Sequence, residues 1–197
     1  RPGPTEVLLA GSGLSLDEEV SGRLYIAYGL SDDIYTQHSG DFGKSWSAPK
    51  KATAGGASQP RISAQWATVQ QQLCLIYVKN GTGLVKRYST DEGKTWGNEM
   101  SLFTGTRPCI CHDHLTGMKL LFYRDGANLM VRRSVDNFAT WLEVAVIVAT
   151  DAADDDVDAD WVADKSHRIM VVYRNVSGAL VRKYSQKNGL APYEEPT

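Results

Sequence analysis

Short apolar runs recur along the chain between polar turns, and four of them end in tyrosine. These runs span residues 24–28, 73–77, 119–123 and 169–173. Their length fits a β-strand, and no segment shows the 3.6-residue periodicity of an amphipathic helix. The runs recur at intervals of about 48 residues, a spacing typical of the blades of a β-propeller.

Each tyrosine run has three further predicted strands around it. An innermost strand precedes it, at residues 6–10, 60–64, 108–112 and 157–161. A short turn leads to a third strand, clearest at residues 84–88, 129–133 and 180–184. A fourth strand follows, at residues 45–52, 95–103, 140–148 and 190–196. The pattern predicts an all-β propeller of about four blades, each a four-stranded antiparallel meander, in a single domain with blades at residues 1–54, 55–104, 105–150 and 151–197.

A turn motif separates the third and fourth predicted strands, with the form Ser-x-Asp-x-Gly-x-Ser/Thr-Trp. The serine and aspartate can satisfy backbone groups of the turn, the glycine takes a left-handed conformation, and the tryptophan can fill space beside the neighbouring sheet. The motif residues are Ser39, Asp41, Gly43 and Trp46 in the first copy, Ser89, Asp91, Gly93 and Trp96 in the second, and Ser134, Asp136 and Trp141 in the third.

The third and fourth copies depart from the motif. Phe138 stands in place of the glycine in the third copy, and we expect Asn137 to take the left-handed conformation one residue earlier. The fourth copy keeps only Ser185 and Gly189.

These turns and their repeat resemble the Asp-box, or BNR, repeats of the sialidase-like propeller families, and the resemblance covers essentially the whole chain. It implies that the box is a structural device at the turn between the third and fourth strands of a blade. It also implies that ligands bind on the face opposite the boxes. The motif residues are therefore expected to stabilise the fold and to take no part in chemistry.

Length, charge and hydropathy argue against some classes of function. The chain has 197 residues and a formal net charge of −2, so there is no electrostatic case for a nucleic-acid partner. No apolar run is long enough to span a membrane, and we expect no membrane insertion. Four blades are few for a propeller, and the chain either closes on itself or completes a larger ring with other residues or subunits; we favour closure.

Charged and planar side chains gather in the turns predicted to lie opposite the boxes. Such groups suit hydroxyl-rich or anionic glycans. The candidate ligand-binding residues there are Arg61, Lys79, Arg107, Arg124, Asp125 and Arg174. Trp66 and Trp161 lie outside the turn motifs and would stack on sugars if exposed, although burial between blades is the favoured interpretation.

An acidic stretch at residues 151–160 suggests one cofactor, calcium. Hard cations take several oxygen ligands from a single loop, and Asp154, Asp156 and Asp158 are the candidates. The stretch lacks the glycine of an EF-hand loop, so a solvated acidic loop is the favoured alternative. Zinc binding by the segment at 109–114 is not expected, because strand alternation sends its cysteines and histidines to opposite faces.

The sialidase resemblance implies, for working enzymes, six blades, an arginine triad, a tyrosine nucleophile assisted by a glutamate, and an acid/base aspartate. Arg61 stands in a segment similar to the family's first arginine motif, but Ser63 replaces its closing proline. We therefore predict a non-catalytic carbohydrate-binding or host-surface attachment module, extracellular or on a virion surface. A sialidase-like glycoside hydrolase and a structural assembly domain of a phage or virion fibre are the alternatives, and a homo-oligomer or larger assembly stays open.

Overall fold

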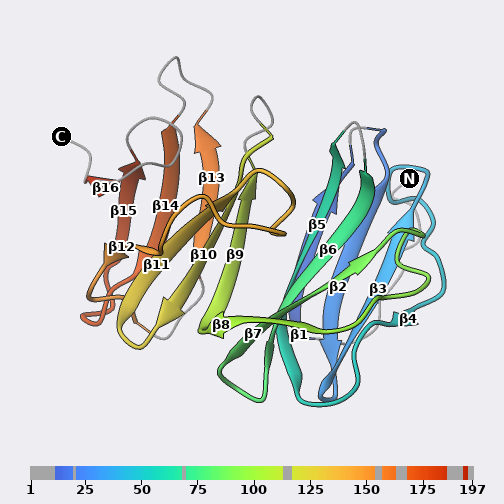
Figure 1. Cartoon of the computed structure of the whole chain (residues 1–197), viewed down its shortest axis with the longest axis horizontal. Helices are drawn as coiled ribbons and strands as arrows, with labels where there is room; N and C mark the ends of the chain where they lie inside the picture. Colours follow the sequence, from blue (N-terminus) through green and yellow to red (C-terminus); the bar gives the residue numbers. More distant parts are fainter. Residues whose placement is uncertain are drawn as a thin grey trace, which may run out of the picture.

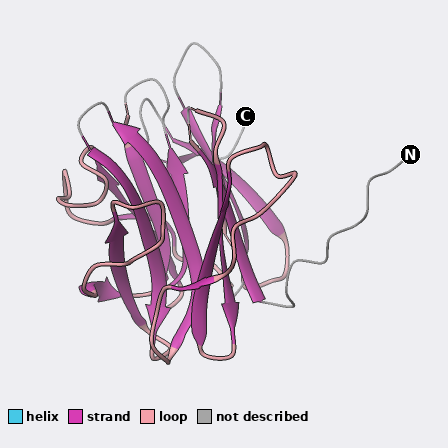
Figure 2. Ribbon diagram, turned by 90° about the vertical axis from the view of Figure 1, so that its right-hand side faces the viewer, coloured by secondary structure: helices cyan, strands magenta, loops and turns pink. Residues whose placement is uncertain are grey.

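The computed structural model describes residues 12–19, 21–67, 70–112, 117–153, 157–162, 168–185 and 193–194. These residues form strands and loops with no helix, as Figure 2 shows, so none of them belongs to a helix that could cross a membrane.

The strands form four antiparallel sheets, each a meander of four consecutive strands, arranged as a four-bladed β-propeller (Figure 1). The first sheet contains β1 (Ser12–Glu18), β2 (Leu24–Leu30), β3 (Asp33–Ser39) and β4 (Lys50–Lys51). The second contains β5 (Ala57–Ala67), β6 (Gln70–Lys79), β7 (Gly83–Ser89) and β8 (Met100–Thr104). The third contains β9 (Thr106–His112), β10 (Lys119–Asp125), β11 (Asn128–Ser134) and β12 (Val146–Ala149). The fourth contains β13 (Asp158–Val162), β14 (Arg168–Arg174), β15 (Leu180–Ser185) and β16 (Tyr193–Glu194). The predicted fold class is confirmed.

The innermost strand of the first blade differs from the prediction. It is Ser12–Glu18, whereas the predicted segment 6–10 lies outside the described residues. The side chains of Ser15 and Asp17 fix this strand against the second blade, because they accept hydrogen bonds from the amides of Ile62 (3.1 Å) and Ala64 (2.8 Å). Sequence analysis favoured the apolar run and missed a strand held by polar side chains.

The outer strands begin later than predicted. In the first blade the predicted strand at 45–52 is reduced to Lys50–Lys51. After the box turn, Ser47 holds the chain beside the third strand without forming a regular strand. Its amide donates to the carbonyl of His38 (2.8 Å), and its hydroxyl accepts from the amide of His38 (3.0 Å). Regular pairing resumes only where Thr36 meets Lys50.

The second strands supply much of the core, and in the two middle blades each face of this strand packs against a different neighbouring blade. In β6, Leu73, Leu75 and Tyr77 join a cluster with the first blade. The alternate residues Cys74, Ile76 and Val78 join a cluster with the third blade. Burial on both faces explains why these strands are continuous apolar runs.

Three blade junctions contain such an apolar cluster. They join the first blade to the second, the second to the third, and the third to the fourth. Within the described ranges no comparable cluster joins the fourth blade to the first. Leu14 and Leu16 of β1 are 66% and 58% exposed, so ring closure remains a prediction.

The box turns share one hydrogen-bond pattern, seen clearly in the second copy. The hydroxyl of Ser89 donates to Asp91 (2.8 Å) and accepts from the amide of Gly93 (2.8 Å). Asp91 also accepts from the amide (2.8 Å) and hydroxyl (2.6 Å) of Thr95. The bonds from Thr95, together with that from Ser89, lower the pKa of Asp91 to about 2.

The third turn keeps this pattern although it lacks glycine. Asn137 and Phe138 both have positive φ, at 55° and 66°, matching Glu92 and Gly93 at 63° and 80°. Asn137 is left-handed, as expected from the sequence, but Phe138 at the glycine position is left-handed as well. Phe138 is fully buried with its ring 5.7 Å from that of Trp141, and this burial offsets the strain of a left-handed phenylalanine, roughly 1–2 kcal/mol.

Replacement of Asp91 by alanine should lower the free energy of unfolding by about 1–3 kcal/mol, because the turn loses the acceptor of three hydrogen bonds. Urea denaturation followed by far-ultraviolet circular dichroism measures the change. Asp125→Ala, at an exposed hairpin end, is the matched control. Equal stability of the two variants would contradict a stabilising role for the turn.

Candidate functional site

The innermost strands of all four blades line one cavity of about 170 Å³ on the propeller axis, here called the axial cavity. Each blade contributes through β1, β5, β9 or β13, since the first strand of every meander lies nearest the axis. The carboxylate, guanidinium and imidazole side chains in its lining are those of Asp17, Asp160, Arg61 and His112. Two carboxylates, a guanidinium and an imidazole from four different blades therefore meet at one place.

The two carboxylates of the axial cavity have different surroundings. Asp17 accepts hydrogen bonds from the amides of Glu18 (2.9 Å) and Ala64 (2.8 Å), and these bonds favour its charged form. Asp160 is exposed on β13. Arg61 is half-buried and one of its terminal nitrogens donates to the carbonyl of Pro60 (3.0 Å).

Of the candidate ligand-binding side chains that are described, only Arg61 lines the axial cavity. The others lie at the blade ends opposite the boxes, on the second, third and fourth blades. Three of them bind nearby carbonyls: Lys79 at Ala54 (3.1 Å) and Gly55 (2.9 Å), Arg124 at Ala152 (3.0 Å), and Arg174 at Gly178 (3.3 Å). Arg107 has a left-handed backbone (φ 53°), and its amide donates to the side-chain oxygen of Gln59 (2.6 Å). Asp125 is exposed. These contacts hold loops in place and do not converge on one site.

The remaining candidates are only partly described. The backbones of Trp66 and Trp161 lie toward the box ends of β5 and β13, paired with Gln71 and Ile169, and their side chains lie outside the described residues. Asp154 and Asp156 also lie outside them. Asp158 is exposed, and within the described part of the chain no group of three metal-ligating side chains is present. The calcium site stays a prediction.

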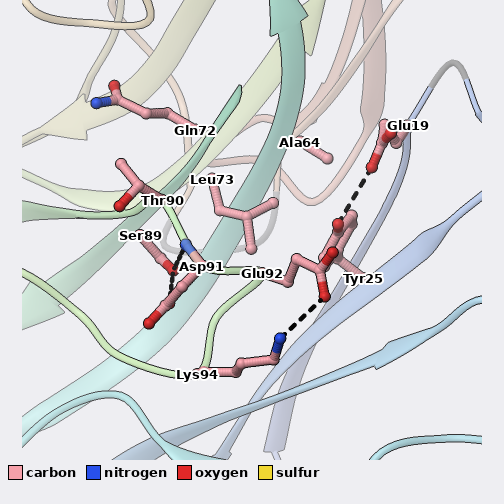
Figure 3. Close-up of a pocket in the computed structure, with 10 residues that line it drawn as sticks. All are labelled: Glu19, Tyr25, Ala64, Gln72, Leu73, Ser89, Thr90, Asp91, Glu92 and Lys94. Atoms are coloured by element: carbon pink, nitrogen blue, oxygen red, sulfur yellow. Dashed lines mark hydrogen bonds and ion pairs between the residues drawn. The ribbon is translucent and has the colours of Figure 1, made fainter. Parts of the chain in front are cut away.

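A second hollow lies between the first and second blades at the box end, and sequence analysis missed it. Two cavities of about 160 and 380 Å³ share Tyr25, Leu73, Glu92 and Lys94, and together form what we call the junction groove. Figure 3 shows Glu19 and Tyr25 on one side of Leu73, with Gln72 and Thr90 on the other.

Buried polar groups form the wall of the junction groove on the first blade. Glu19 is only 5% exposed, and it accepts hydrogen bonds from the hydroxyls of Tyr25 (3.1 Å) and Ser21 (2.7 Å). Burial raises the pKa of Tyr25 to about 12, so its hydroxyl keeps its proton at neutral pH. On the opposite wall, Glu92 pairs with Arg23 of the first blade and with Lys94 (3.4 Å).

The junction between the second and third blades is filled at the corresponding place. The amine of Lys119 is fully buried, donates to Ser63 and to Asn137 (2.8 Å), and lies 5.7 Å from the ring centre of Phe138. Lys86 donates to the carbonyl of Phe138. Burial lowers the pKa of Lys119 to about 8.

No protein-family model matches the sequence, and no curated protein is similar enough in sequence to match. Solved structures of similar fold do exist. The NanB sialidase from Streptococcus pneumoniae matches with a TM-score of 0.62 and 17% identity, over 87% of this chain and 29% of that one. An α-L-arabinanase from Penicillium chrysogenum matches with a TM-score of 0.66 and 16% identity, over 92% and 63%. The catalytic domain of an α-L-arabinofuranosidase from Coprinopsis cinerea matches with a TM-score of 0.66 and 13% identity, over 99% and 70%.

These similarities show a propeller fold shared with a sialidase and other glycoside hydrolases. At such low identity they show the fold alone. The chain spans less than two thirds of the sialidase and arabinanase chains that it matches.

Lys119 gives the folded protein a defined pH dependence. Its folded pKa lies near 8, below its ordinary value of 10.5, so between these values the unfolded chain binds more protons and the folded state gains stability as pH rises. Relative to Lys119→Met, the wild type should gain about 1–3 kcal/mol between pH 7.5 and 10. Urea denaturation at each pH measures the difference.

Lys44→Met, which removes an exposed positive charge, measures the effect of net charge alone. A difference between the wild type and Lys119→Met that stays constant across this pH range would show that the Lys119 amine titrates normally.

Proposed function

We propose that this protein acts on carbohydrate as a glycoside hydrolase, with the glycan bound at the axial cavity. One observation carries the proposal: Asp17 and Asp160, from the first and fourth blades, line a single cavity together with Arg61 and His112. Hydrolysis of a glycosidic bond generally needs two carboxyl groups on either side of the bond. The fold similarity to sialidases and arabinan-degrading enzymes supports the same reaction class.

The surroundings of the two carboxylates assign their roles. Asp17, charged and held by two amides, stabilises positive charge at the anomeric carbon or attacks it. Asp160, which is open to solvent, donates a proton to the leaving oxygen as the glycosidic bond breaks, and then takes a proton from the water that adds to the anomeric carbon. Arg61 binds a hydroxyl or anionic group of the sugar through its planar donors.

The size of the axial cavity limits the substrate. At about 170 Å³ it is smaller than the roughly 300–1,000 Å³ of most ligand pockets. It would hold one sugar residue, so we propose that the enzyme acts on the terminal residue of a glycan.

A second candidate is the non-catalytic carbohydrate-binding or attachment module, extracellular or on a virion surface. The bond from the amide of Ala64 to Asp17 favours it, because this bond also ties β1 to β5 and so gives the carboxylate a structural role. In this case the axial cavity binds a glycan and releases it unchanged.

We also propose that the three turns sharing the serine–aspartate pattern are Asp-boxes of the sialidase-like propellers. Their shared bonds support this assignment, because Ser39, Ser89 and Ser134 each donate to the aspartate two residues later. The boxes stabilise the blades and leave chemistry to other residues.

Turnover of aryl glycosides, including those of sialic acid and α-L-arabinofuranose, tests the enzyme proposal. Asp160→Asn should reduce kcat by about 100-fold or more with little change in Tm, since the side chain is exposed. Asp125→Asn, an exposed aspartate away from the axis, should leave turnover unchanged.

Binding on a glycan array decides between the two candidates if no glycoside is cleaved. Binding that is lost in Arg61→Gln would indicate the attachment module. If the protein shows no turnover and no binding that depends on Arg61, both candidates are refuted.

A further inference from the structure

The junction groove is open where the next junction is filled, because smaller side chains stand at the corresponding positions. Leu73 and Lys119 hold the same register position, each paired with the first serine of a box. From the same blades as Leu73 and Lys119, Gly93 and Phe138 each lie four residues after that serine. From the preceding blades, Thr36 and Lys86 each lie three residues before the first serine of their own box. Lysine and phenylalanine side chains thus fill one junction, and their absence leaves the other hollow.

The glycine of the second box opens directly into this space. The nearest atoms to a Cβ added at Gly93 would belong to Thr36 at 3.5 Å, Leu73 at 3.6 Å and Trp96 at 3.7 Å, which are ordinary contact distances. At the corresponding place, the chain itself accommodates phenylalanine with nearly the same positive φ. The hollow is therefore a property of these side chains and not of the backbone.

The walls of the groove are held in place from both blades. Arg23 of the first blade pairs with Glu92 of the second, and the indole of Trp96 donates to the hydroxyl of Thr36 (3.4 Å). The bonds of the box fix the backbone that carries Glu92 and Lys94. Such a site is preformed and loses little conformational entropy when a ligand binds.

The chemistry of the groove changes from its interior to its mouth. In the interior, the buried carboxylate of Glu19 accepts one hydrogen bond at each oxygen, and each oxygen keeps a lone pair for a further hydroxyl donor. At the mouth, Lys50 and Lys94 carry exposed amines. Glu92 pairs with both Arg23 and Lys94, so these two cations exceed its single negative charge. Burial lowers the pKa of His38, and with Lys50 beside them the cations give the mouth a net positive charge at neutral pH.

We propose that the junction groove is a second binding site, for a hydroxylated carboxylate such as a uronic acid residue of a glycan. The ligand hydroxyls donate to the carboxylate of Glu19. The ligand's own carboxylate lies between Lys50 and Lys94, above the apolar side chain of Leu73. The site lies at the box end between two blades and shares no lining residue with the axial cavity. It is independent of whether the axial cavity binds or cleaves a glycan.

Titration of the ¹⁵N-labelled protein with D-glucuronate, and separately with D-glucose, tests the site. Glucuronate should shift the amide signals of His38, Gly93 and Lys94 with a Kd about fivefold or more below that of glucose, because only glucuronate offers a carboxylate to the lysines. The Lys50→Gln, Lys94→Gln double variant should remove this preference. Lys44→Gln, which changes an exposed lysine outside the groove, should keep it.

Gly93→Phe introduces the residue found at 138 and should abolish the shifts while leaving turnover or binding at the axial cavity unchanged. If this variant does not fold, the double lysine variant decides. Equal affinity for the two sugars, shifts confined to residues outside the groove, or full binding by the double lysine variant would overturn the proposal. Loss of axial activity with intact glucuronate binding would instead contradict the proposed function alone.

Discussion

Burial of the second strand on both faces in the two middle blades is the constraint on which the structure depends. In β6 the residues Leu73, Leu75 and Tyr77 face one neighbouring blade, and Cys74, Ile76 and Val78 face the other. A sheet with two apolar faces is unstable in water unless another sheet covers each face, so the blades must stack around an axis. The exposed Leu14 and Leu16 of β1 mark the junction where no such cluster is described.

Stacking of this kind has two consequences for function. It brings the first strands of all blades to the axis, where side chains distant in sequence, such as Asp17 and Asp160, line one cavity. It also makes each junction a separate compartment whose content depends on a few side chains. Lys119 and Phe138 fill one junction, whereas Leu73 and Gly93 leave its neighbour open.

The box turns illustrate how one backbone serves different side chains. The serine and aspartate bonds recur in three copies, and they hold two successive residues at positive φ. In the second copy the left-handed glycine borders a groove, and in the third a left-handed phenylalanine fills the core. The motif therefore sets the backbone and leaves the chemistry beside it to vary.

The four-stranded architecture of the blade and its repeat could be predicted from the sequence, because the apolar runs, hairpin glycines and box turns are local signals with a regular period. It also located the second strand of each blade closely, and the third strand of the last three blades. It did not locate β1, since Ser15 and Asp17 hold this strand by side-chain bonds to another blade. The axial cavity and the junction groove were decided only by tertiary structure, because each depends on which residues of different blades face one another, and a repeat period carries no such information.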